Sequence, residues 1–151
     1  MAQDSFHGLL SALADALGCG SLPPEKDGRV LFGLDGKMGV VIERADPDEA
    51  GRDCLVVSIL VGRPDTSDAD LLKDLLMGNY MWSASGEGTL AIDRGTGILV
   101  VQRLFETAAP PEEFVDVFAS MAGAARYWLP RLQAAAPDDS VFPAEFYSLR
   151  V

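Results

Sequence analysis

The spacing of apolar residues near the N-terminus predicts an α-helix over residues 4–17. The apolar residues recur three or four positions apart and therefore share one face: Phe6, Leu9, Leu10, Leu13 and Leu17. Asp4 or Ser5 is placed to cap the first turn, and Gly18 and Gly20 can end the helix in a left-handed conformation. The proline-containing stretch that follows is expected to be a loop.

Three apolar runs after this helix predict β-strands. They span residues 29–34, 38–44 and 54–62. The DGK sequence between the first two predicts a hairpin turn, because Gly36 can adopt a positive φ. The third run, CLVVSILVG, is rich in β-branched residues and suits a central strand.

A leucine-rich helix and a second pair of strands follow. The helix is predicted over residues 67–79, with Thr66 or Ser67 as its cap. Its apolar stripe consists of Leu71, Leu72, Leu75 and Leu76. Strands are predicted at 88–94 and 97–105, on either side of a glycine-containing turn.

A long final helix is predicted from Pro110 and Pro111, because proline suits the first helical turn. Its apolar face consists of Phe114, Val117, Phe118, Met121, Ala125, Trp128, Leu129 and Leu132. From Pro137 the sequence has no clear period. The element order, α-β-β-β-α-β-β-α, predicts a single α+β domain in which three helices accompany an antiparallel sheet. We expect this domain to span residues 1–136 and a C-terminal tail to span 137–151.

The chain carries a strong negative charge. It has 23 acidic residues against 12 basic ones among 151, which gives a formal net charge of −11. Such a surface repels nucleic-acid phosphates and anionic lipids, so we expect neither nucleic acid nor a membrane as partner. A basic protein would be attracted, although solubility alone explains the charge equally well.

Cysteine usage and the N-terminal sequence favour the cytosol. Cys19 and Cys54 belong to no CxxC or Cys/His cluster, which predicts reduced thiols and no structural zinc. The N-terminus lacks a basic region followed by an apolar run, so no secretory signal is expected. The longest apolar run, residues 54–61, is too short to span a bilayer. We therefore expect a cytoplasmic protein.

No motif in the sequence indicates catalysis. His7 is the single histidine and has no nucleophile nearby in sequence, and a two-histidine metal site is excluded. The glycines at 86–89 and 95–97 are interpreted as turns, since neither segment has the lysine of a phosphate-binding loop. The acidic clusters at 46–49 and 64–70 lack calcium-loop spacing. We expect no catalytic residue, no metal, no cofactor and no enzyme activity.

Apolar surface is the remaining functional signal. The leucine-rich helix ends in Tyr80, Met81 and Trp82, residue types that are enriched at protein interfaces but are also common in cores. One small sheet cannot bury broad apolar faces of three helices equally well. We therefore expect one face to be left for a partner protein.

The chain resembles the type III secretion chaperones of the class I, CesT-like kind, up to about Gln133. The segment DLLKDLLMGNYMW followed by GEGTLAIDRGTGILVVQRLF is similar to the family's leucine-rich helix, glycine turn and two apolar strands. The segment EEFVDVFASMAGAARYWLPRL is similar to the family's closing helix. Size, element order and acidity agree with this resemblance.

The resemblance implies a cytosolic homodimer that binds the N-terminal segment of a secreted effector in extended form, without nucleotide. Such binding would prevent aggregation and keep the effector competent for export. It also makes the secretion ATPase a candidate partner. The implied dimer interface consists of Leu75, Leu76, Tyr80, Trp82, Leu90 and Ile92. The implied effector-binding residues are Phe6, Leu10, Leu13, Leu34, Val40 and Ile42.

Two other classes of function remain open at this point. A non-catalytic regulatory or scaffold module of the same fold would bind a folded protein instead of an extended segment. A small-molecule binder or enzyme would need a concave pocket with converging polar groups.

Overall fold

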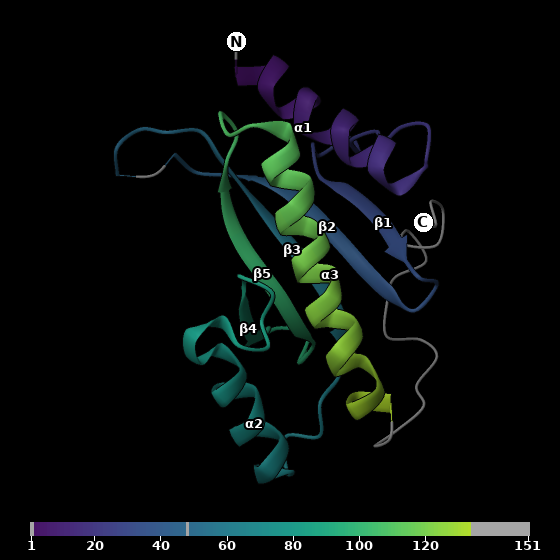
Figure 1. The fold of residues 1–151 in the computed structure, drawn as a ribbon, viewed down its shortest axis with the longest axis vertical. Helices are drawn as coiled ribbons and strands as arrows, with labels where there is room; N and C mark the ends of the chain where they lie inside the picture. The colour runs from purple at the N-terminus through teal and green to yellow at the C-terminus, as the bar shows by residue number, and fades with distance from the viewer. Residues whose placement is uncertain (1, 48, 134–151) are drawn as a thin grey trace.

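The computed structural model describes residues 2–47 and 49–133 (Figure 1). The elements are α1 (Ala2–Leu17), β1 (Val30–Leu34), β2 (Met38–Ala45), β3 (Cys54–Gly62), α2 (Ala69–Asn79), the 3-10 turn η1 (Tyr80–Trp82), β4 (Thr89–Ile92), β5 (Leu99–Glu106) and α3 (Pro111–Gln133). The predicted α+β class and element order are confirmed. The predicted tail, 137–151, lies outside the described residues.

The five strands form one antiparallel sheet in the order β1-β2-β3-β5-β4. β3 is the central strand, as its β-branched composition predicted. One register row crosses all five strands and is buried throughout: Phe32, Val40, Ile59, Val101 and Leu90. Because side chains alternate along a strand, this row and its neighbours two residues away define the face that packs against the helices.

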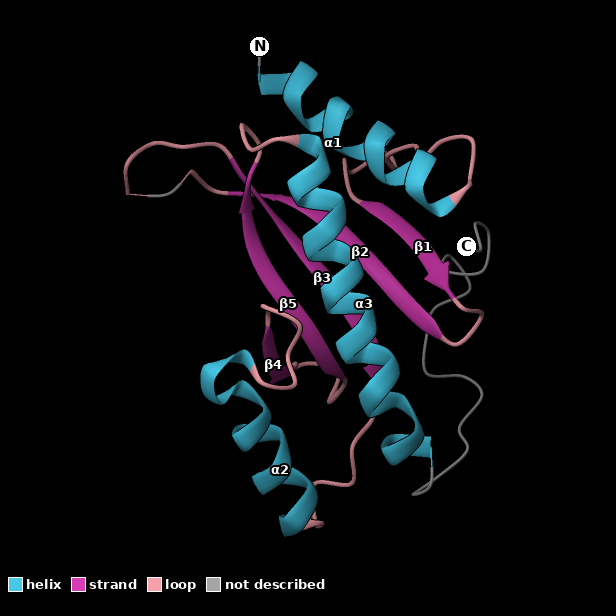
Figure 2. Ribbon diagram, in the orientation of Figure 1, coloured by secondary structure: helices cyan, strands magenta, loops and turns pink. Residues whose placement is uncertain are grey.

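Two helices cover that face. Figure 2 shows α3 crossing the sheet, with α1 beside its N-terminal half. The Phe118 ring of α3 lies 6.2 Å from the Phe32 ring of β1. α2 packs mainly on β4, at the far edge of the sheet from β1. None of the described helices has the length and apolar character needed to span a bilayer.

The helix starts differ from those predicted. α1 begins at Ala2, so Asp4 and Ser5 lie inside it and neither is its cap. α2 is capped by Asp68, whose carboxylate accepts a hydrogen bond from the Leu71 N–H at 3.0 Å. Ser67 instead donates to the Asp65 carboxylate. The cap prediction was wrong by one residue because serine, threonine and aspartate compete equally well for such a position.

The β1–β2 turn confirms the predicted hairpin and fixes one end of the sheet to α3. Asp35 and Gly36 both have positive φ, 56° and 68°, as a tight hairpin turn requires. The Asp35 carboxylate accepts two hydrogen bonds from the Arg126 guanidinium of α3, at 2.6 and 3.1 Å. These bonds lower the pKa of Asp35. The C-terminal part of α3 therefore lies over the end of β1.

Candidate functional site

An apolar patch lies exposed on α2, η1 and β4. We call it the α2 patch, and it consists of Leu76, Met77, Tyr80, Met81, Trp82 and Ile92. The first five side chains are between 60% and 76% exposed, and Ile92 is 37% exposed. Contiguous exposed apolar residues of this kind mark protein-interaction surfaces.

The end of α2 is held to β4 by one side chain. The Asn79 amide accepts a hydrogen bond from the Leu90 N–H at 2.8 Å and donates one to the Leu90 carbonyl at 3.0 Å. Inside this joint, a Cβ added to Gly78 would lie 3.0 Å from the side chains of Leu90 and Trp128. Such close packing fixes the direction in which the chain leaves α2.

We predict that Asn79→Ala releases the end of α2 from β4. The substitution leaves both backbone groups of Leu90 without their partner, which costs about 1–3 kcal/mol per buried group. We expect a lower midpoint in urea unfolding and faster amide exchange at residues 88–92 than at 54–62. Ser83→Ala is the matched control, because the Ser83 hydroxyl bonds only to carbonyls of its own turn. Equal exchange in both variants would contradict the role of Asn79.

The turn after Asn79 is strained. Met81 and Trp82 both adopt left-handed φ, 52° and 55°, which costs roughly 1–2 kcal/mol for each non-glycine residue. The turn is nevertheless held in place, because the Trp128 indole donates to the Ala84 carbonyl at 2.8 Å. The result is that both strained residues have exposed side chains, while the segment around them is fixed to α3.

A groove adjoins Trp82. It has a volume of about 530 Å³ and is lined by Trp82, Ser83, Ala84, Gly86, Ser120, Gly123, Ala124 and Tyr127. The floor is made of small side chains from α3, and Tyr127 is 60% exposed at its rim. Groove and α2 patch share Trp82 and form one continuous apolar surface.

The structure divides the predicted dimer residues into two groups. Leu76, Tyr80, Trp82 and Ile92 belong to the α2 patch. Leu75 and Leu90 are each 6% exposed and pack in the core beneath it. Met77, Met81 and Tyr127 were missed among the exposed residues. Met77 follows the predicted stripe directly, but the side of α2 that faces outward depends on how the helix sits on β4.

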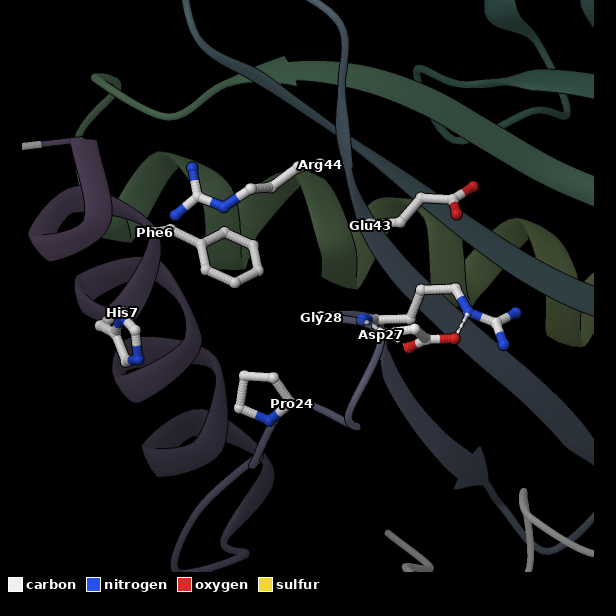
Figure 3. Close-up of a pocket in the computed structure, with 8 residues that line it drawn as sticks. Phe6, His7, Pro24, Asp27, Gly28, Glu43 and Arg44 are labelled. Carbon is white, nitrogen blue, oxygen red and sulfur yellow. Dashed lines mark hydrogen bonds and ion pairs between the residues drawn. The ribbon is translucent and has the colours of Figure 1, made fainter.

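A second candidate surface lies at the opposite edge of the sheet, around the start of β1. A pocket of about 480 Å³ is lined by Phe6, His7, Pro24, Asp27, Gly28, Arg29, Glu43 and Arg44, and we call it the edge pocket. Figure 3 shows the α1 residues on one side and the Asp27–Gly28 loop on the other. Apolar walls and charges of both signs make it suitable for a peptide side chain with a polar end.

The charges of the edge pocket are ordered by local contacts. The Arg44 guanidinium carbon lies 4.5 Å from the centre of the Phe6 ring, within range of a cation–π interaction (Figure 3). Arg29 donates from its backbone N–H and its guanidinium to Asp27, at 3.1 and 2.7 Å. The backbone bond, followed by the side-chain bond, lowers the pKa of Asp27. Neither arginine was found from sequence, because nothing in the local pattern brings 27–29 next to 43–44.

All six predicted effector-binding residues lie in the hydrophobic core. Their exposed fractions run from 0% to 4%: Phe6, Leu10, Leu13, Leu34, Val40 and Ile42. Only Phe6 also lines a pocket. A client on this side of the molecule would therefore contact the edge strand and the edge pocket above these residues. Effector contact by the six side chains themselves stays a prediction that the structure leaves untested.

The described part of the chain contains no group of three or more His, Cys, Asp or Glu side chains arranged to hold a metal ion. The glycine turns have a packing explanation. Gly86 has a φ of +58°, and a Cβ there would lie 2.1 Å from the Ser120 carbonyl oxygen of α3. A Cβ at Gly88 would lie 3.0 Å from the Gln102 carbonyl oxygen of β5. These contacts account for both glycines without a bound phosphate.

The sequence matches the Tir chaperone protein (CesT) family over residues 8–129. The chain belongs to this family. The match covers every element from α1 to α3 and confirms the resemblance to type III secretion chaperones. No curated protein sequence matches this CesT-family chain.

Solved structures share its fold. A chain of the ExsC–ExsE complex superposes with a TM-score of 0.68 at 21% identity, covering 88% of this chain and 97% of that one. A chain of the HopA1–SchA chaperone–effector complex has a TM-score of 0.64 at 16% identity, covering 83% and 94%. A chain of the heterodimeric ExoU–SpcU complex from the type III secretion system of Pseudomonas aeruginosa has a TM-score of 0.59 at 20% identity, covering 85% and 97%.

Proposed function

We propose that this CesT-family protein is a cytosolic, non-catalytic chaperone that binds the N-terminal segment of a type III effector in extended form and keeps it soluble and competent for export. Family membership over residues 8–129 carries this proposal. Two of the structures with the same fold, HopA1–SchA and ExoU–SpcU, are complexes from effector secretion, and the first is a chaperone–effector complex.

The edge of β1 supports binding of an extended client. β1 pairs with β2 on one side, and no other described strand pairs with its outer edge. An extended peptide can add backbone hydrogen bonds to such an edge while alternate side chains enter pockets. The edge pocket opens beside the first residue of β1 and would accept one of these side chains.

The α2 patch supports a homodimer. Its six residues are too exposed to contribute to the core, and their strained turn is held in place by Trp128. A second copy of the chain would bury the patch and double the client-binding surface. Assistance from a secretion ATPase has no separate structural support and remains an implication of family membership.

Capture from the native bacterial host tests the function. The tagged chain should retain a secreted effector, and limited proteolysis of the purified complex should leave the N-terminal segment of that effector bound. Recovery of only folded cytosolic proteins would contradict the proposal and favour a regulatory or scaffold module. Thermal stabilisation by a metabolite would favour a small-molecule binder.

We predict that Arg44→Ala weakens client binding about tenfold or more, because it removes the cation above Phe6 from the edge pocket. Calorimetry with the captured N-terminal segment measures the change. Arg52→Ala is the matched control, since Arg52 is an exposed arginine that pairs with Glu106 away from the pocket. Equal loss of affinity in both variants would point to general charge attraction and contradict a specific pocket.

A further inference from the structure

The strand β1 is an edge strand without the usual protection of an edge. It is the sequence VLFGL, with no charged residue, no proline and an uninterrupted register with β2. Exposed apolar edges of this kind pair with other chains and aggregate, so natural proteins shield them with charges, bulges or a covering segment. Only the last of these devices is left for β1.

The side chains of β1 are buried on both faces. Phe32 and Leu31 alternate onto opposite faces, yet they are 0% and 7% exposed. The Leu31 face carries no helix: α1 and α3 contact the other face, through Phe6 beside Arg44 and through Phe118 beside Phe32. At the opposite side of the same open face, Leu104 is 54% exposed. Leu31 is therefore shielded where Leu104 is not.

The C-terminal segment 134–151 has a sequence suited to cover an edge. Its last five residues are Tyr-Ser-Leu-Arg-Val, in which apolar and polar residues alternate: Tyr147, Ser148, Leu149, Arg150 and Val151. This is the period of a half-buried strand, and the segment equals β1 in length. Pro143 precedes it and would stand outside the paired region.

The end of α3 starts this segment from the right side of the molecule. Leu132 packs against Gly62, the last residue of β3, and Arg126 bonds to Asp35 just after β1 ends. Residues 134–146 can span roughly 43 Å when extended. The outer edge of β1 is about three strand spacings from β3, or roughly 14 Å. A chain that arrives there from α3 would run antiparallel to β1.

We propose that residues 147–151 pair with the outer edge of β1 as a sixth, antiparallel strand and act as an internal competitor of the client. We call this segment the C-terminal strap. The strap shields Leu31 and blocks edge-to-edge aggregation while no client is bound. The competition rests on the proposed client site at β1, whereas the pairing itself does not.

Hydrogen exchange on the full-length chain without client tests the pairing. A charge on the apolar side of the strap, in the double variant Tyr147→Asp/Leu149→Asp, should speed amide exchange at residues 30–34 about tenfold or more and leave 54–62 unchanged. Ser148→Asp, on the other side, is the control and should exchange like the parent. A synthetic peptide of residues 144–151, added to the double variant, should restore slow exchange. Equal exchange at 30–34 in the parent and the double variant would overturn the strap.

Client affinity separates the strap from the proposed function. Once the captured effector segment is in hand, the double variant should bind it more tightly than the parent, since no strap has to be displaced. Faster exchange at 30–34 with unchanged client affinity would support the strap and contradict a client site on β1. Unchanged exchange with intact client binding would overturn the strap and leave the chaperone function standing.

Discussion

An aspartate at Trp82 should convert the protein from a dimer into a monomer. Trp82 is 61% exposed, lies where the α2 patch meets the groove, and is the type of residue that dominates binding energy at interfaces. Loss of the indole and burial of a carboxylate together should cost about 3 kcal/mol, which raises the dimer dissociation constant roughly 100-fold. Sedimentation at micromolar concentration should then give the monomer mass of 16.1 kDa.

The fold should tolerate this substitution. Aspartate adopts left-handed φ more readily than tryptophan, so Trp82→Asp relaxes the strained turn. Leu104→Asp is the matched control, because Leu104 is similarly exposed but lies on β5 outside the α2 patch. A parent protein that is already a monomer at this concentration, or equal dissociation in both variants, would contradict the α2 patch as the dimer interface.

The order of the elements was predictable because each strongly patterned segment folds according to its own period. β3 is the clearest case: its β-branched run predicted residues 54–62, and the structure has Cys54–Gly62. The edge strand β4 is shorter than predicted, Thr89–Ile92 instead of 88–94. There the Asp93 carboxylate accepts backbone hydrogen bonds from Gly95 and Thr96, which ends the strand in a turn.

The candidate sites were only partly predictable, because an amphipathic pattern does not say whether an apolar face meets the core or a partner. Leu13 and Leu76 both belong to regular apolar stripes, yet they are 1% and 74% exposed. α1 packs against α3 and the sheet, whereas α2 packs on β4 alone and leaves part of its stripe uncovered. That difference arises from long-range packing. An aspartate at Leu13 would therefore probe folding and not client contact.

The two candidate surfaces lie at opposite edges of the sheet, and this separation has a functional consequence. The α2 patch is next to β4, and the edge pocket is next to β1. A dimer formed through the α2 patches would leave the β1 edge of each copy accessible at the outer ends. One extended client could then contact both copies in succession, which agrees with binding of a long unfolded segment.

Replacing Gly86 with alanine should strongly destabilise the protein. The new Cβ would lie 2.1 Å from the Ser120 carbonyl oxygen, 2.6 Å from its carbonyl carbon and 2.9 Å from the Met121 Cα. All three are backbone atoms of α3 and cannot rotate away, and the φ of +58° at Gly86 adds strain for any residue with a Cβ. We expect a loss of about 3–5 kcal/mol in unfolding free energy, against a typical total of about 5–15 kcal/mol.

The matched control is Gly123→Ala on the facing surface of α3. No heavy atom lies within 4 Å of a Cβ added there, so alanine should stabilise the helix by about 1 kcal/mol. Urea unfolding of both variants in the Trp82→Asp background separates folding from dimerisation, and shifts of opposite sign are expected at a constant slope. Because Gly86 seats the turn against α3, its replacement should also displace Trp82 in the parent background and weaken the dimer. A Gly86→Ala protein as stable as the parent would mean that the turn does not rest on α3, and the position of Trp82 beside the groove would then lose its structural basis.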